Sequence, residues 1–158
     1  MQVLTFMVES VECGIDAADV REICLYQEPS AIAGLPGSLC GIINLRGSII
    51  PVLDMRRALQ LPETEVTRYT ATVILNVGER AIGVVVDSVC EVLAVQPEEI
   101  VRPAFFDDET AAYVRGVVSR ESRLITVFDL YALVAGCRGT VDGAAMFAEL
   151  GKERRAVA

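Results

Sequence analysis

The side chains that most often carry out chemistry in proteins are sparse in this chain. It has cysteines at positions 13, 24, 40, 90 and 137, and no histidine. It therefore lacks the commonest general base, the usual activator of a nucleophilic thiol, and the imidazole ligands of many zinc sites. The odd number of cysteines and the absence of a C-x-x-C pair argue against a disulfide framework. We expect most thiols to be reduced core residues, with a redox or metal-binding role as the lesser alternative.

The carboxylates show no pattern typical of a catalytic pair. Glu98 and Glu99 are sequence neighbours, as are Asp107 and Asp108, and both pairs fall in segments that we expect to be loops. Such pairs are more often solvated than placed on either side of a substrate. The sequence also lacks a glycine-rich phosphate-binding loop between a strand and a helix. It therefore predicts a chain that is not an enzyme and that holds no cofactor or metal.

Charge and hydropathy restrict the partners further. The 158 residues carry a net charge of −8, so the chain gains nothing from neutralising phosphates and we expect no nucleic-acid partner. The apolar runs 49–53 and 81–86 are far shorter than the roughly 20 residues that a membrane-spanning helix needs. The N-terminus lacks the basic and apolar segments of a signal peptide. We therefore expect a cytoplasmic protein that does not itself insert into a membrane.

Apolar residues alternate in the manner of β-strands over much of the chain. Runs rich in β-branched residues and bounded by turn residues lie at 3–8, 48–53, 72–77, 81–86 and 123–128. Helical spacing is confined to short segments near 54–60, 129–135 and 142–150. Asp54 and Asp129 precede the first two of these segments and are suited to cap them. The sequence thus predicts a mainly β chain with a few short helices.

The chain also repeats itself. A shift of 69 residues places Leu4, Phe6, Val8, Gly14, Glu22 and Ile23 on Val73, Leu75, Val77, Gly83, Glu91 and Val92. A shift of 75 residues places 41–55 on 116–130, with apolar positions on apolar positions and Asp54 on Asp129. Each copy reads as about five short strands, and a sheet so small usually curls into a barrel that hides its edges.

Two copies of this kind predict two five-stranded barrel lobes of the SH3-like kind. The first would span about residues 1–60 and the second about 70–136, either one after the other or intertwined. A barrel of about 70 residues is marginal alone, so the lobes should share an apolar interface. Three repeat-related pairs are expected to point inward: Ile42, Ile50 and Val52 in the first copy, and Val117, Ile125 and Val127 in the second.

One long segment resembles a known family. Residues 41–56, with the sequence GIINLRGSIIPVLDMR, are similar to the signature stretch of the CheW family, from which they depart only by Met55 in place of leucine. Weaker matches stand in the expected order at 20–23, 87–92 and 115–130. The resemblance covers nearly the whole of residues 1–138, which we take as one domain. Residues 139–158 remain as a tail or short helix.

The resemblance implies two intertwined SH3-like barrels around a common core. It also implies a non-catalytic adaptor that couples methyl-accepting chemoreceptors to a CheA-type histidine kinase. The expected partners are the kinase's regulatory domain and the cytoplasmic tip of the receptors, which would recruit the chain to membrane arrays. An adaptor of a non-motility array, governing pili, surface sensing or a cyclic-nucleotide output, is the alternative.

The residues around Arg46 are the candidate partner-binding site. Asn44 to Gly47 lies between two strands and reads as a hairpin turn, in which Asn and Gly tolerate left-handed backbone. Arg46 is either a solvated turn residue or the partner of Glu22. The resemblance favours the pair, because it places both groups at the receptor-facing groove. We expect the apolar floor of that groove to come from Val20, Ile23, Val84 and Val86.

The second copy differs at the equivalent positions. Glu91 repeats Glu22, but Glu121 stands where Arg46 would be, so the same ion pair cannot form there. This divergence fits two different partner faces, although drift alone would also produce it. The extra residues of the second copy include Phe105 and Phe106, which cannot both point inward from one strand. One of the two is either a core residue that bridges the lobes or an anchor for a partner.

Overall fold

A computed structural model describes residues 1–33 and 39–135 of the chain. These residues form ten strands: β1 (Gln2–Val8), β2 (Val11–Asp16), β3 (Val20–Leu25), β4 (Leu39–Leu45), β5 (Ser48–Asp54), β6 (Ala71–Val77), β7 (Arg80–Val86), β8 (Ser88–Ala94), β9 (Val114–Arg120) and β10 (Arg123–Phe128). The helices are α1 (Met55–Ala58), α2 (Asp108–Tyr113) and α3 (Leu130–Ala135). The mainly β fold with short helices is confirmed. None of the described helices is long and apolar enough to cross a membrane. The predicted helix at 142–150 lies outside the described residues.

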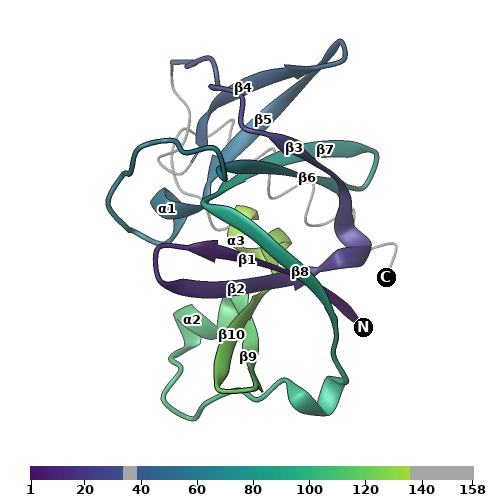
Figure 1. Cartoon of the computed structure of the whole chain (residues 1–158), viewed down its shortest axis with the longest axis vertical. Coiled ribbons are helices and arrows are strands. Elements are labelled where there is room, and N and C mark those ends of the chain that lie inside the picture. The colour runs from purple at the N-terminus through teal and green to yellow at the C-terminus, as the bar shows by residue number, and fades with distance from the viewer. Residues whose placement is uncertain (34–38, 136–158) are drawn as a thin grey trace.

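The strands form two five-stranded sheets, which lie one above the other in Figure 1. Sheet A, in the lower half of the view, has the order β8-β1-β2-β10-β9, and sheet B has the order β3-β6-β7-β5-β4. Neither sheet forms a backbone ladder between its first and last strands among the described residues. The expected barrels are therefore open along one side. We call these open sides seam A and seam B.

The two sequence repeats do not correspond to the two sheets. The first repeat supplies β1 to β5, yet β1 and β2 lie in sheet A while β3 to β5 lie in sheet B. The second repeat does the reverse, placing β6 and β7 in sheet B and β8 to β10 in sheet A. The division into consecutive lobes at residues 1–60 and 70–136 is thus wrong, and the intertwined alternative is confirmed. Each repeat lends its first hairpin to the other, so neither sheet can form from one repeat alone.

Three apolar cores hold this arrangement together. The central core lies between the sheets and combines Leu4 and Phe6 of the first repeat with their mates Val73 and Leu75 of the second. A smaller core in sheet B contains Ile43, Ile50, Val52 and Ile74, and its counterpart in sheet A contains Val3, Val95, Val118, Ile125 and Val127. Burial of these side chains is the main force that stabilises two such small sheets.

Four of the six predicted inward residues are confirmed. Ile50, Val52, Ile125 and Val127 are at most 2% exposed. Ile42 and Val117 are only half-buried, and their neighbours Ile43 and Val118 take the core positions instead. The reason is the register of the two hairpins, in which Ile43 lies opposite Ile50 and Val118 lies opposite Ile125. Opposite residues of an antiparallel pair share a face, so a difference of one residue exchanges the core face for the outer face.

Ile42 and Val117 have a different role, in isolated bridges to a second backbone segment. The backbone of Ile42 exchanges two hydrogen bonds with Ser30, and Val117 does the same with Val101. Gly41 precedes the first of these bridges with a φ of +146°, and a Cβ there would stand 2.3 Å from the Ser30 carbonyl oxygen. The glycine is therefore required by the close approach of a second backbone.

Two further predictions concern the helices and the inserted loop. Asp54 Oδ1 accepts the Arg56 amide at 2.9 Å and Asp129 Oδ1 accepts the Ala132 amide at 3.2 Å, so both predicted caps are confirmed. Of the two loop phenylalanines, one lies against the core and the other is exposed. Phe106 packs against the central core, whereas Phe105 is 84% exposed.

Candidate partner-binding site

An ion pair closes seam B, where the first and last strands of sheet B approach each other. Arg46, in the β4–β5 turn, reaches Glu22 on β3 with Nη1 to Oε1 at 3.0 Å and Nη2 to Oε2 at 2.5 Å. This forked geometry is the strongest arrangement that an arginine and a carboxylate can adopt. The predicted pairing of Arg46 with Glu22 is therefore confirmed. The pair joins two edge strands that share no backbone ladder.

The turn itself presents Arg46. Leu45 pairs with Ser48, so the hairpin loop is only two residues long. Arg46 and Gly47 have φ values of 49° and 89°, as a type I′ turn requires. The left-handed conformation is thus adopted by Arg46 rather than by Asn44. Asn44 acts through its side chain instead, with Oδ1 accepting the Gly47 amide at 2.9 Å.

The electrostatics of seam B hold Glu22 in its charged form. The hydrogen bond from Arg46 lowers the pKa of Glu22 below its ordinary value. The neighbouring thiol of Cys24 points at the same carboxylate, with Sγ 3.9 Å from Oε1. Burial raises the pKa of Cys24 and keeps this thiol protonated at neutral pH. Seam B therefore presents a fixed carboxylate and a partly free guanidinium.

The structure does not gather all the predicted site residues on one surface. Glu22, Asn44, Arg46 and Gly47 lie together, but the neighbouring residue Ile23 points to the other face of β3. On that face Ile23 lies beside Val73 of the central core and is 47% exposed. Val20 also packs against the central core. The Arg46 pair and the exposed Ile23 thus belong to opposite faces of one edge strand.

Val84 and Val86 are not part of any accessible surface. Each is 1% exposed and lies in the central core. The prediction that they floor a groove is wrong. Both residues follow the alternation of β7, a strand that is flanked on both sides by other strands of sheet B. Sequence alternation identified them as apolar and inward but could not tell the floor of a groove from the interior of the molecule.

The edge strands at seam A are bridged by Arg120 on β9, whose Nη2 donates to the Ala94 carbonyl oxygen of β8 at 3.1 Å. Beside seam A, a larger ion cluster that the repeat comparison missed connects the β9–β10 hairpin to β2 and β8. Arg123 on β10 donates from Nε and Nη2 to Glu12 on β2, and from Nη1 to Glu91 on β8 at 2.9 Å. Glu91 is the repeat mate of Glu22, so the acidic partner is retained while the base has moved. Arg123 is the mate of Ser48, two positions beyond the mate of Arg46. A search of the whole hairpin for a cation, rather than of the single equivalent position, would have found it.

Exposed apolar residues lie on both sheets. In sheet B they are Ile23 and Leu25 on the edge strand β3 and Ile49 on β5. In sheet A they are Val92 on the edge strand β8, Val11 on β2 and Leu124 on β10. Four of these positions form two pairs related by the repeat, Ile23 with Val92 and Ile49 with Leu124. Exposed apolar residues in groups are typical of surfaces that bind another protein. Both sheets therefore offer an apolar face next to a charged seam.

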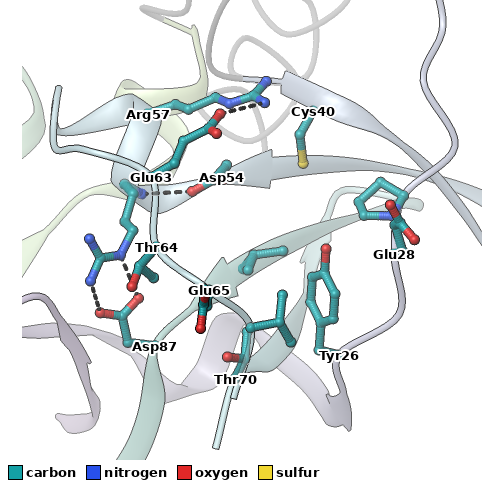
Figure 2. A pocket seen from close by; sticks show the side chains of 14 residues that line it. Tyr26, Glu28, Cys40, Asp54, Arg57, Glu63, Thr64, Glu65, Thr70 and Asp87 are labelled. Atoms are coloured by element: carbon teal, nitrogen blue, oxygen red, sulfur yellow. Dashed lines mark hydrogen bonds and ion pairs between the residues drawn. The ribbon is translucent and has the colours of Figure 1, made fainter. Parts of the chain in front are cut away.

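A cavity of about 330 Å³ lies beside α1 (Figure 2). It is lined mostly by polar and charged residues, among them Glu28, Asp54, Arg57, Glu63 and Asp87. Figure 2 shows Cys40 at its rim, with its thiol pointing into the space above Tyr26. Burial raises the pKa of Cys40 to about 11, so this thiol is protonated at neutral pH and is a poor nucleophile.

Comparison with known proteins identifies the family. A family model described as CheW-like domain matches residues 2–137. This chain belongs to the CheW-like domain family. The chemotaxis protein CheW of Bacillus subtilis is 33% identical over 134 residues, covering 84% of this chain and 86% of that protein. The chemotaxis protein CheW of Klebsiella aerogenes is 34% identical over 134 residues, with coverage of 84% and 80%.

The fold agrees with a solved CheW structure. The crystal structure of the scaffolding protein TtCheW from Thermoanaerobacter tengcongensis superposes with a TM-score of 0.76 and 26% identity, covering 84% of this chain and 86% of that one. On the CheW-like fold described here, the signature segment 41–56 runs along β4, through the Arg46 turn, along β5 and into α1. It therefore contains both the residue that closes seam B and the first turn of the helix beside the cavity.

Proposed function

We propose that this CheW-like chain is a non-catalytic adaptor of chemotaxis, which couples chemoreceptors to a CheA-type histidine kinase at the cytoplasmic side of receptor arrays. The observation that carries the proposal is the presence of two separate charged seams, each beside exposed apolar residues, on one intertwined body. An adaptor needs two faces that can be occupied together. The curated relatives are named for chemotaxis, which favours this role over a non-motility array.

The receptor is proposed to bind at seam B. Arg46 is 63% exposed, so its guanidinium can still meet a carboxylate or carbonyl of a partner while Glu22 holds its direction. Ile23 and Val20 on the other face of β3 supply apolar contact at the same strand edge. A helical receptor tip that lays an apolar stripe along β3, with polar groups toward Arg46, Asn44 and Gly47, would use an ordinary mode of helix recognition.

The kinase is proposed to bind at sheet A. Val11, Val92 and Leu124 are 41%, 55% and 67% exposed, and each is the sequence neighbour of a member of the ion cluster formed by Glu12, Glu91 and Arg123. The regulatory domain of the kinase is related to CheW by the resemblance, so a contact between two similar barrel-like sheets is expected. Transient contacts of this kind bury modest areas and give affinities in the micromolar range.

A pair of alanine variants separates the two faces. Arg46→Ala should reduce kinase stimulation in receptor-containing membranes while leaving binding to the isolated kinase regulatory domain unchanged, because seam A is intact. Arg123→Ala should weaken binding to that domain. Arg57→Ala is the matched control, since Arg57 pairs with exposed Glu63 away from both seams. Calorimetry measures kinase binding, and a phosphorylation assay with receptor membranes measures coupling.

Three outcomes would overturn parts of this proposal. If the wild-type chain gives no heat with the kinase domain at roughly 100 µM, a concentration well above a micromolar Kd, the adaptor role fails. Equal loss of both readouts in Arg46→Ala would move Arg46 to the kinase face. If Arg46→Ala and Arg57→Ala behave alike in both assays, Arg46 is only a solvated residue and seam B is not the receptor site.

A further inference from the structure

A second arginine in the signature segment has contacts that neither seam explains. Arg56 in α1 donates from Nε and Nη2 to the two carboxylate oxygens of Asp87, at 2.9 and 2.6 Å. Its Nη1 donates to Glu9 Oε2 at 2.6 Å and to the Pro62 carbonyl oxygen at 2.8 Å. We call Arg56, Asp87 and Glu9 the Arg56 cluster. The Arg56 side chain is only 12% exposed, so this is not an ordinary surface ion pair.

The Arg56 cluster connects the two sheets. Arg56 follows β5 and so belongs to sheet B, whereas Glu9 lies in the β1–β2 turn of sheet A. Asp87 is the single residue between β7 and β8, where the second repeat passes from sheet B to sheet A (Figure 1). Its backbone amide bonds the Met7 carbonyl and its Oδ2 accepts the Glu9 amide at 2.8 Å. Figure 2 shows Asp87 at the foot of the cavity, with dashed lines to the guanidinium above it.

The other crossing between the sheets has a weaker counterpart. A shift of 75 residues places Arg56 on Tyr131, and a shift of 69 places Glu9 on Gly78. Tyr131 bonds the Asn76 carbonyl at 2.5 Å and Asp19 at 3.4 Å, in the region where the first repeat passes from sheet A to sheet B. Glu9 and Gly78 share left-handed backbone, with φ values of 59° and 63°. The left-handed turn residue is thus repeated at both crossings, but of the two crossings only the one at Arg56 is built from three charged side chains.

We propose that Arg56 is a positioning residue, which fixes the orientation of sheet A relative to sheet B and thereby the orientation of the kinase face relative to the receptor face. The inference rests on the proposed function for its consequence in signalling, but not for its structural part. An adaptor that transmits a change from one face to the other needs a defined relation between them, because coupling is carried by contiguous groups that connect the two sites. Arg56 contacts neither face and links the elements that carry both.

The structural part is tested without any partner. Residual dipolar couplings of the backbone amides in the full-length chain report the orientation of each sheet. In the wild type, couplings from both sheets should fit one alignment tensor. Arg56→Gln removes the charge and the fork, and the two sheets should then require different tensors. Arg57→Gln is the matched control, because it removes one charge from the same short helix and should leave a single tensor. A single tensor in Arg56→Gln would overturn the inference.

The functional part is tested in the coupled assay. In Arg56→Gln, binding to the kinase domain alone and to receptor membranes alone should match the wild type, while kinase stimulation in the ternary assembly falls about fivefold or more. Arg56→Lys keeps the charge without the fork and should be intermediate. Tyr131→Phe, at the weaker crossing, should change stimulation less than Arg56→Gln. If Arg56→Gln requires different tensors for the two sheets but stimulates the kinase as the wild type does, Arg56 holds the sheets together without affecting signalling, and the positioning role is overturned. If the wild-type chain binds neither the kinase domain nor receptor membranes, the proposed function is wrong, but the conclusion from the alignment tensors about sheet orientation is unaffected.

Discussion

Sheets A and B are built from equivalent strands but are closed by different chemistry. The core positions are conserved between the repeats, as Ile50 and Val52 in sheet B match Ile125 and Val127 in sheet A. The seams are not. In seam B one carboxylate, Glu22, has the 63% exposed Arg46 in a fork and Arg21 at 3.8 Å, whereas Arg123 beside seam A is 35% exposed and holds two carboxylates.

This difference separates what the fold requires from what a partner requires. Both seams need some link between edge strands that form no ladder, and an arginine supplies it in each sheet: Arg46 reaches Glu22 on β3, and Arg120 reaches the Ala94 carbonyl oxygen on β8. The position of that arginine is free within the hairpin, because only its reach matters. The guanidinium of Arg46 in seam B is largely accessible, whereas the guanidinium of Arg123 beside seam A is bonded to two carboxylates of the chain itself. Two faces of different polarity on one scaffold are what an adaptor with two partners needs.

The largest effect is expected from a charge in the paired small cores. Val52→Asp and Val127→Asp each place a carboxylate at a position that is 0% exposed. An unpaired buried charge should lower the free energy of unfolding by about 4 kcal/mol or more, which exceeds or nearly exhausts the stability of a small domain. Because the sheets exchange hairpins, either change should unfold both sheets. Circular dichroism during heating measures this, and a variant in which one sheet melts separately would contradict the intertwined fold.

Glycine substitutions should cause the next largest loss of stability. Gly41→Ala places a Cβ 2.3 Å from the Ser30 carbonyl oxygen, and Gly116→Ala places one 2.7 Å from the Val101 carbonyl oxygen. Both sites have positive φ, so backbone strain of about 1–3 kcal/mol adds to the clash. Urea unfolding should show both variants to be destabilised, Gly41→Ala more than Gly116→Ala. Gly47→Ala is the control for strain alone, since nothing lies within 4 Å of a Cβ there.

The strands could largely be predicted from the sequence, but the register between neighbouring strands could not. The repeat predicted the strands, their order along the chain and most inward residues, because apolar alternation and turn residues are local signals. It did not predict that Ile43 rather than Ile42 faces the core. That choice depends on the register between β4 and β5, which places Ile43 opposite Ile50 and which the alternation of one strand does not report.

The candidate site was predicted to a similar extent. Glu22 and Arg46 were expected to pair, and they do, because the family resemblance supplied a contact between distant segments. Val84 and Val86 were expected on a groove floor and are core residues, since inward alternation is the same in both cases. The Arg56 cluster was not predicted at all. Its three members lie in different elements, and only the exchange of strands between the sheets brings them together.

A smaller effect is expected at Thr72, the repeat mate of Val3. Thr72 is 1% exposed and its hydroxyl has no hydrogen-bond partner among the described residues. Thr72→Val replaces the hydroxyl by a methyl group of similar size, so it should raise the free energy of unfolding by about 1 kcal/mol. Val3→Thr makes the reverse change in sheet A and should destabilise. Denaturant midpoints measure both, and destabilisation by Thr72→Val would mean that the hydroxyl is bonded after all.

The smallest effect, and the one that bears most directly on the two seams, is the pH dependence of the Arg46 pair. Arg46 lowers the pKa of Glu22 from an ordinary value of 4.5, so the charged form is favoured in the folded state. A lowered carboxylate pKa stabilises the fold above the ordinary pKa, and that contribution disappears as the pH falls through the lowered value. Melting temperatures of the wild type and Arg46→Ala should therefore differ slightly at neutral pH and converge in acid.

The Arg123 cluster beside seam A provides the comparison for the size of this effect at neutral pH. Arg123→Ala leaves Glu12, whose side chain is 13% exposed, without its partner, so the melting temperature should drop further than in Arg46→Ala. If Arg46→Ala were the more destabilising of the two at neutral pH, seam B would be the structural seam, and the exposed guanidinium of Arg46 could not be assigned to a partner.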